Sequence, residues 1–169
     1  MMSNDKTECT TSPSCGKKCC PVPYIVASFA VFLVIFAFEA VFHGVLMMPH
    51  YQATASMWRP PADMQAHMAF GLVRQIGTAL VFTCLFGCLL KQSECAECPI
   101  KKGAKLGLKI GLILGLAQFG SYAWLPFPDL QIPVMWLVGN TVLGALMGMA
   151  AGAVFKIMKK KELDTTLKP

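Results

Sequence analysis

Apolar and polar residues alternate along this chain in long blocks rather than in single positions. Four apolar runs, separated by short polar segments, cover residues 23–48, 66–90, 105–125 and 132–157. A helix needs roughly 20 apolar residues to cross the hydrocarbon core of a bilayer, and each run is long enough. The segments between the runs are too short to build a soluble core. The pattern therefore predicts an all-α fold, a four-helix transmembrane bundle formed by one membrane domain at residues 22–158.

The distribution of charge predicts how this bundle is oriented. Every lysine lies before the first run, between the second and third runs, near the start of the third, or at and beyond the end of the fourth. The opposite side carries Arg59, Asp63 and Asp129 instead. Because positive charge favours the cytoplasmic side, both termini and the 91–105 loop are expected in the cytoplasm, with the chain in a bacterial inner membrane. The net charge of +6 is therefore no sign of nucleic-acid binding.

Two polar tails flank the membrane domain. Residues 1–21 are rich in Ser, Thr, Pro and Cys and are expected to be a disordered cytoplasmic tail. Residues 159–169 are basic and are expected to lie at the anionic inner leaflet and to fray.

Glycine recurs at every fourth position in the third run and again in the fourth. The positions are Gly103, Gly107, Gly111 and Gly115, then Gly144, Gly148 and Gly152. Small residues at this spacing let two membrane helices approach closely and pack by van der Waals contact. The pattern predicts a tight hairpin of the third and fourth helices, joined by the Pro-rich turn LPFPDLQIP.

Each apolar run also carries one polar side chain at a similar depth, about a turn outward from its midpoint. These side chains are Glu39, Arg74, Gln118 and Asn140. An unpaired charge in hydrocarbon is costly, so Glu39 is expected to pair with Arg74, with Gln118 and Asn140 satisfying the remaining donors and acceptors. Such a cluster either holds the helices in register or forms a site for a ligand, proton or ion that opens outward.

Two histidines extend this cluster toward the outer surface. His43 follows Glu39 by four residues on one helix face, and His67 precedes Arg74 on the second helix. With the Glu39 carboxylate, the two imidazoles form a donor set that suits a divalent metal ion, although their spacing matches no known motif. Tyr51 and Trp58, in the segment between the first two helices, are expected to be interfacial anchors.

The cysteines all fall on the predicted cytoplasmic side or in the inner half of the second run. A reducing cytoplasm disfavours structural disulfides, which leaves metal binding, redox chemistry or inert thiols. The candidate ligands for zinc, copper or iron are Cys15, Cys19, Cys20, Cys95 and Cys98. Cys84 and Cys88 are expected to pack between helices as small apolar side chains.

Some of these segments carry a resemblance to known proteins. They are Glu39-x-x-x-His43-Gly44, Tyr51-x-x-Thr54-Ala55-x-x-Trp58-Arg59 and the two glycine-patterned helices. In them the chain resembles a group of small four-span bacterial inner-membrane proteins of uncharacterised function. The resemblance covers residues 25–157 and leaves out the Cys-rich tail and the C-x-x-C loop. It implies a four-span topology with a shared outward-facing site or packing core, and it implies no activity, cofactor or catalytic residue.

Three functions remain open at this point. The sequence has no nucleotide-binding loop, no nucleophile–base pair at recognisable spacing and no haem motif, which favours a non-enzymatic role. The first hypothesis is a membrane protein that binds or moves a small ligand, with a metal ion as the leading candidate. The second is an accessory subunit of a larger membrane complex, with the glycine faces and the Trp58–Arg59 loop as contact surfaces. The third is a redox protein that uses the cytoplasmic thiols.

Overall fold

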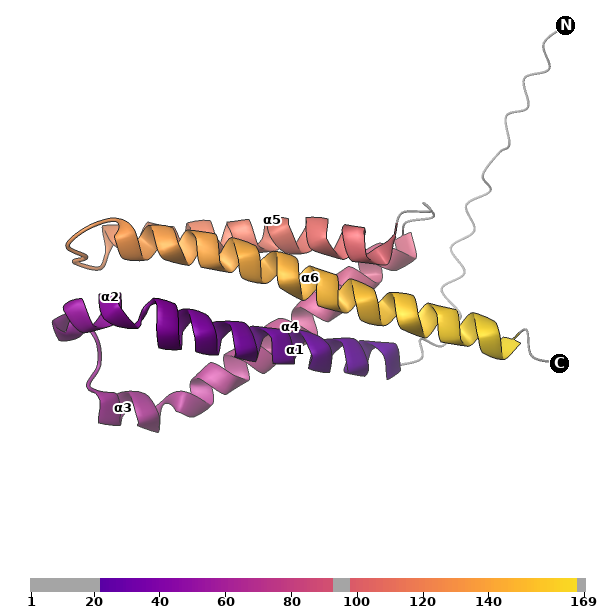
Figure 1. Cartoon of the computed structure of the whole chain (residues 1–169), viewed down its shortest axis with the longest axis horizontal. Coiled ribbons are helices and arrows are strands. Elements are labelled where there is room, and N and C mark those ends of the chain that lie inside the picture. Colours follow the sequence, from indigo (N-terminus) through magenta and orange to yellow (C-terminus); the bar gives the residue numbers. More distant parts are fainter. Residues whose placement is uncertain (1–21, 93–97, 167–169) are drawn as a thin grey trace, which may run out of the picture.

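The computed structural model describes residues 22–92 and 98–166, and within these ranges the chain is helical with no strand (Figure 1). The elements are α1 (Val22–Val41), a π-helical segment (Phe42–Leu46), α2 (Met48–Ala53), a 3₁₀ turn (Ala55–Met57), α3 (Pro61–Ala66), α4 (Met68–Gln92), α5 (Pro99–Phe119), a second 3₁₀ turn (Gly120–Ala123) and α6 (Gln131–Thr166). Four helical stretches are long and apolar enough to cross a membrane. They are Val22–Leu46, Met68–Leu90, Pro99–Ala123 and Gln131–Lys160. The predicted all-α fold is confirmed, and the chain is a multi-pass membrane protein.

Two helices are longer than the hydrophobic pattern predicts. α5 begins at Pro99 rather than near residue 105, because proline is well suited to the first turn of a helix, where its missing N–H is not needed. α6 continues to Thr166, past the expected boundary at residue 158. The Lys, Glu and Leu residues of this stretch favour helix, and the expected fraying of residues 159–169 stays a prediction. The N-terminal tail, residues 1–21, lies outside the described residues.

α5 and α6 form a hairpin whose backbones touch. The glycines of α5 are buried, and a Cβ atom added at Gly107 would overlap the carbonyl oxygen of Gly144. A Cβ at Gly103 would likewise overlap the carbonyl oxygen of Gly148. The two helices run side by side along their length (Figure 1). The glycine faces are thus occupied within the chain and are not free as surfaces for another subunit.

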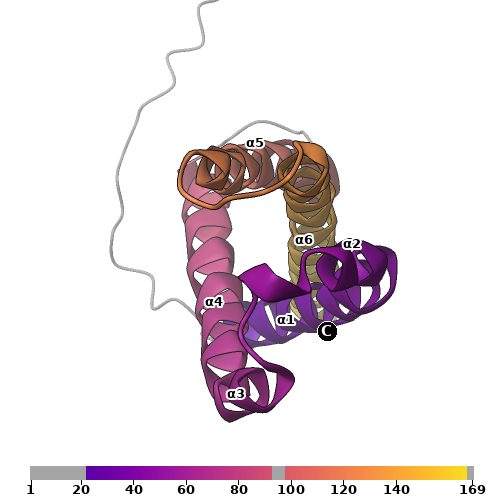
Figure 2. The same ribbon diagram turned by 90° about the vertical axis from the view of Figure 1, so that its left-hand side faces the viewer.

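α4 packs against α1 but is separated from α5 over most of the length of α4. The main apolar core joins α1, α4 and α6 through Val31, Ile35, Ala79, Phe82, Phe86, Leu143, Met147 and Ala151. At the end of the bundle away from α2 and α3, the ring of Phe86 reaches α5, with its Cζ 3.2 Å from a Cβ built at Gly103. From there α4 diverges toward α3, so the four long helices surround a central axis in end view (Figure 2). We call the end that carries α2 and α3 the loop end.

A second apolar cluster closes the loop end. Phe42, Met47, Phe127 and Ile132 are buried there, with Tyr51, Trp58 and Trp136 packed against them. The ring of Trp58 lies edge-on to Tyr51 with ring centroids 5.2 Å apart. Tyr51 and Trp58 therefore pack into the protein, unlike the interfacial anchors expected. Trp124, which is 83% exposed, is the surface tryptophan of this end.

Candidate functional site

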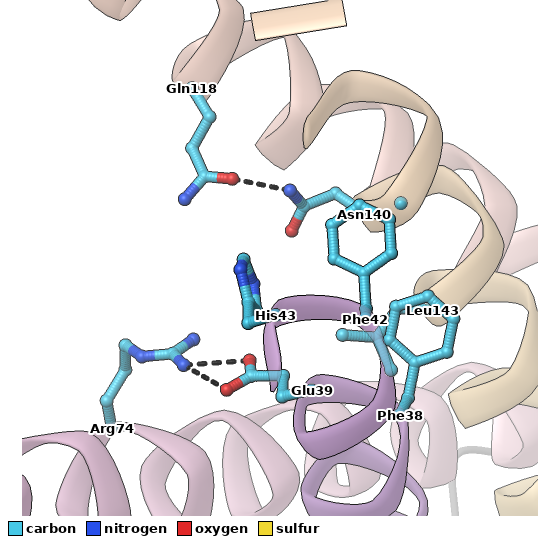
Figure 3. Close-up of a pocket in the computed structure, with 9 residues that line it drawn as sticks. Phe38, Glu39, Phe42, His43, Arg74, Gln118, Asn140 and Leu143 are labelled. Atoms are coloured by element: carbon cyan, nitrogen blue, oxygen red, sulfur yellow. Dashed lines mark hydrogen bonds and ion pairs between the residues drawn. The ribbon is translucent and has the colours of Figure 1, made fainter. Parts of the chain in front are cut away.

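Two adjoining cavities lie between α1, α4, α5 and α6 in the half of the bundle nearer the loop end. Their volumes are about 280 and 410 Å³. Both are lined by Glu39, Arg74, Gln118, Asn140 and Leu143, so we treat them as two lobes of one site. The smaller, polar lobe adds His43 and the Phe38, Phe42 and Gly139 surface (Figure 3). The larger, apolar lobe continues between α4 and α5.

An ion pair connects α1 to α4 at the edge of the cavity. Arg74 Nη2 donates to both oxygens of the Glu39 carboxylate, at 2.7 and 2.6 Å. Gln75 Nε2 donates to Glu39 Oε2 at 2.8 Å. The Glu39 side chain is 16% exposed and the Arg74 side chain 60% exposed, so the acid is held inside by two donors. The Nε and Nη1 groups of Arg74 make no hydrogen bond within the described chain.

An amide pair from α5 and α6 lies across the cavity from this ion pair. Asn140 Nδ2 donates to the Trp136 carbonyl oxygen at 2.8 Å and to Gln118 Oε1. Because a backbone carbonyl can only accept, the first bond fixes which way the Asn140 amide points. Both protons of Nδ2 are then used. Asn140 Oδ1 remains as an acceptor and Gln118 Nε2 as a donor, and neither has a partner among the residues the structure describes.

His43 lies between the ion pair and the amide pair (Figure 3). Its Nδ1 is 2.6 Å from the hydroxyl of Tyr51, which also accepts a hydrogen bond from Trp136 Nε1 at 2.9 Å. Burial raises the pKa of Tyr51, although the Trp136 hydrogen bond acts in the opposite direction, so the phenol keeps its proton. The indole N–H can only donate, so when His43 Nδ1 carries no proton it is the acceptor for the Tyr51 hydroxyl. A neutral His43 is then the Nε2–H tautomer and offers this N–H to the cavity.

A local change in helix geometry positions His43. The chain turns more widely at Phe42–Leu46, where Met47 N donates to Phe42 O, five residues back, at 2.8 Å. In a continuous α-helix the ring of Pro49 would collide with the carbonyl of Val45. The wide turn ends just before this proline, and such π-helical turns often occur at functional sites.

We expect Tyr51→Phe to lower the free energy of unfolding by about 1–2 kcal/mol, because the Trp136 N–H loses its acceptor. Thermal or denaturant unfolding in detergent, followed by tryptophan fluorescence, measures this. Tyr122→Phe is the matched control, since Tyr122 is exposed and its hydroxyl has no partner in the described chain. That variant should stay within about 0.5 kcal/mol of the wild type. Equal effects would show that the Tyr51 hydroxyl adds nothing to stability.

The third histidine does not join the site. His67 ends α3, and its Nδ1 lies 2.8 Å from the carbonyl oxygen of Asp63 and 3.5 Å from its Oδ1. Asp63 also pairs with Arg59 at 3.1 Å. The chain breaks between α3 and α4 at His67, so this imidazole stays beside its own helix. The predicted polar cluster is thus assembled without His67.

The structure does not assemble the proposed Glu39, His43 and His67 metal set. In residues 22–92 and 98–166, no three His, Cys, Asp or Glu side chains lie close enough to hold a metal ion. The other set, the thiolates, is mostly beyond what the structure describes. Cys15, Cys19, Cys20 and Cys95 lie outside the described residues, and Cys98 alone of that set is placed.

The described cysteines differ in their surroundings. Cys84 and Cys88 are exposed on α4 rather than packed between helices, which corrects the prediction from the sequence. Cys98 precedes α5. The backbone N–H of Ile100 lowers the pKa of the Cys98 thiol, and partial burial acts in the opposite direction. The Lys101 N–H and the positive charges of Lys156 and Lys101 lower this pKa further. The thiolate is the reactive form of cysteine, so the lowered pKa should make Cys98 reactive at lower pH than a thiol in a free peptide.

The expected result is an alkylation midpoint for Cys98 at lower pH in the folded protein than in a free peptide of residues 96–104. Iodoacetamide labelling across a pH series, read by mass spectrometry of the Cys98 peptide, measures both. The midpoint should lie at lower pH because the lowered pKa of Cys98 makes its thiolate available at lower pH. Identical midpoints would show that the start of α5 has no influence on this thiol.

Two residues of the site were not assigned to it from the sequence. Gln75 shares the Glu39 carboxylate with Arg74, and its own Oε1 is buried without a partner in the described chain. The sequence feature that could have indicated Gln75 is a second polar residue directly after Arg74 in an otherwise apolar run. The Tyr51 hydroxyl accepts a hydrogen bond from Trp136, 85 positions away along the chain, and no local sequence pattern predicts that contact.

The fold and this site define a multi-pass membrane protein whose long helices bring polar side chains to a shared internal cavity. Compared with known proteins, the chain matches no family model, no curated protein and no solved structure.

Proposed function

We propose that this chain is a non-enzymatic bacterial inner-membrane protein that binds, or moves, a small ligand in the two-lobed cavity. The observation that carries the proposal is the convergence of Glu39, His43, Arg74, Gln118 and Asn140 on one cavity. Each of the four spans contributes at least one of them. Polar side chains inside a membrane protein are costly and mark functional sites by default.

Unused hydrogen-bonding groups support a binding site over simple packing. Polar groups that only hold helices together are normally paired with each other. Here the described residues leave the Nε and Nη1 groups of Arg74, the Nε2 of Gln118 and the Nε2 of His43 available to another molecule. Asn140 Oδ1 adds one acceptor. This lining favours an organic ligand with several acceptor atoms over a metal ion, which needs a set of ligands that the described residues do not assemble.

The charge pattern supports an orientation with the cavity in the outer half of the membrane. Lys101, Lys102 and Lys105 lie at the start of α5, at the end of the bundle away from the loops. Arg59, Asp63 and Asp129 occupy the loop end instead. Cytoplasmic segments are the ones enriched in lysine and arginine, so both termini lie in the cytoplasm and the loop end faces outward.

The test is purification of the full chain in mild detergent, followed by native mass spectrometry of whatever small molecule travels with it. The wild type and Gln52→Ala, an exposed glutamine of α2, should both carry the molecule. Gln118→Ala should lose it while unfolding at the same temperature. A stable protein partner with no small molecule in the wild type would favour the accessory-subunit hypothesis and overturn ligand binding.

A further inference from the structure

The two lobes of the cavity differ in chemistry and follow one another along the long helices, which in the proposed orientation cross the membrane. Below the shared polar residues, the larger lobe is lined chiefly by Ile35, Ile110, Leu114, Leu143 and Met147. On α1 the lining passes from the shared Glu39 to Ile35, which lines only the apolar lobe. On α6 it passes from the shared Asn140 to Met147, which also lines only the apolar lobe. Both steps lead away from the loop end, toward the middle of the bilayer. The cavity therefore has a polar part near the surface and an apolar part deeper in.

The larger lobe is lined by exposed residues of both α4 and α5, among them Arg74, Leu114 and Gln118, so it opens between these two helices. These helices approach at Phe86 and Gly103 and diverge toward the loop end (Figure 1, Figure 2). Arg74 on α4 and Gln118 on α5 are both exposed at the edges of the lobes. A hydrocarbon chain in the outer leaflet can therefore reach the apolar lobe without crossing a packed helix interface.

The polar lobe is electrically balanced. The charges of Glu39 and Arg74 cancel within their ion pair. A ligand with a net charge would bring an uncompensated charge into a low-dielectric site, which is costly. Among the described residues, three side chains, those of Arg74, Gln118 and His43, keep donors that suit phosphate oxygens, which arginine binds particularly well. The free Asn140 Oδ1 suits a donor such as an ammonium group.

We propose that the ligand is a zwitterionic amphiphile from the outer leaflet, with a phosphate–ammonium head in the polar lobe and an acyl chain in the apolar lobe. The head would lie toward the surface and the chain toward the bilayer centre, the orientation that a lipid already has in that leaflet. This inference rests on the proposed function, because it names the ligand class of the same cavity.

The experiment compares defined probes on the full chain in maltoside micelles, with binding read from the shift of the thermal unfolding midpoint with probe concentration. The probes are dihexanoyl phosphatidylethanolamine, dihexanoyl phosphatidylglycerol and free phosphoethanolamine, the last supplied as its glycerol diester so that, like the zwitterionic lipid, it carries no net charge. The zwitterionic lipid should bind about tenfold more tightly than either of the other two. Gln118→Ala should weaken its binding about tenfold while keeping its advantage over free phosphoethanolamine.

A pair of tryptophan substitutions on α5 tests the apolar lobe separately. Ala117 lines only this lobe, so Ala117→Trp should remove the advantage of the chain-bearing probe over free phosphoethanolamine. Ile113 is 65% exposed and lines neither lobe, so Ile113→Trp is the matched control and should bind as the wild type does. Loss of binding in both variants would show that bulk on α5 acts through the fold, and would count against the chain site.

The remaining outcomes separate this inference from the proposed function. If free phosphoethanolamine binds as tightly as the lipid, or the anionic lipid binds more tightly, the zwitterionic amphiphile is wrong while small-ligand binding stands. If no probe binds but a Gln118-dependent molecule still co-purifies, the ligand class is again wrong and the cavity is still a site. If no probe binds and nothing co-purifies, both proposals fail.

Discussion

Replacing Gly107 by valine should force α5 away from α6 and lower the free energy of unfolding by about 3 kcal/mol or more. A Cβ at this position would overlap the carbonyl oxygen of Gly144, and the backbone of the facing helix cannot move aside as a flexible side chain can. The hairpin must therefore separate or shift its register. Titration of the folded protein with SDS in mixed micelles measures the loss.

Gly77→Ala is the matched control for this prediction. Gly77 also lies in a spanning helix, α4, but a Cβ built there has nothing within 4 Å. Alanine should be tolerated and should stabilise by up to about 1 kcal/mol, since it is the better helix former. A comparable loss in both variants would mean that the helix contact does not depend on glycine.

Replacing Arg74 by glutamine should lower the free energy of unfolding by about 3 kcal/mol, at the low end of the cost of breaking a buried pair. Glu39 is the buried partner and, among the described residues, would be left with Gln75 as its hydrogen-bond donor. Arg74 itself is 60% exposed, which is why the cost does not reach the upper end of that range. The double variant Glu39→Gln/Arg74→Gln replaces the ion pair with two amides and should recover more than half of the loss.

The pair at Arg59 and Asp63 is the control for this double-mutant cycle. Its side chains are 64% and 43% exposed, and exposed ion pairs contribute below about 1 kcal/mol. Arg59→Gln should therefore have a small effect, and a cycle with Asp63→Asn should be nearly additive. Additive losses at Glu39 and Arg74 as well would show that these two residues do not act as a pair.

Much of the fold could be predicted because a helix that crosses a bilayer must be long and apolar enough to span the hydrocarbon core. The length of each apolar run determined the four spans, and the spacing of glycine in the third and fourth runs identified the two helix faces that now touch. Depth along a helix follows directly from residue number, since each residue adds about 1.5 Å. That is why Glu39 and Arg74, and separately Gln118 and Asn140, could be placed at one level from the sequence alone.

The parts of the site that escaped prediction depend on irregular backbone. The wide turn at Phe42–Leu46 and the short helix α2 bring Tyr51 back over His43, and neither follows from hydrophobic periodicity. The break at His67 directs that side chain to Asp63, although helical spacing alone put it on the Arg74 face. Cys84 and Cys88 were misplaced because an apolar run does not tell which of its faces meets protein and which meets lipid.

The length of α6 has a practical consequence. Its 36 residues measure about 54 Å as a straight helix, whereas a bilayer with its headgroups is about 40–45 Å thick. With its first residue at the outer headgroups and the average tilt of a membrane helix, α6 therefore extends past the headgroups as a helical rod at the end opposite the loops. A reporter domain joined beyond Thr166 would be held away from the lipid headgroups by this helical extension. Its orientation would then report the tilt of α6.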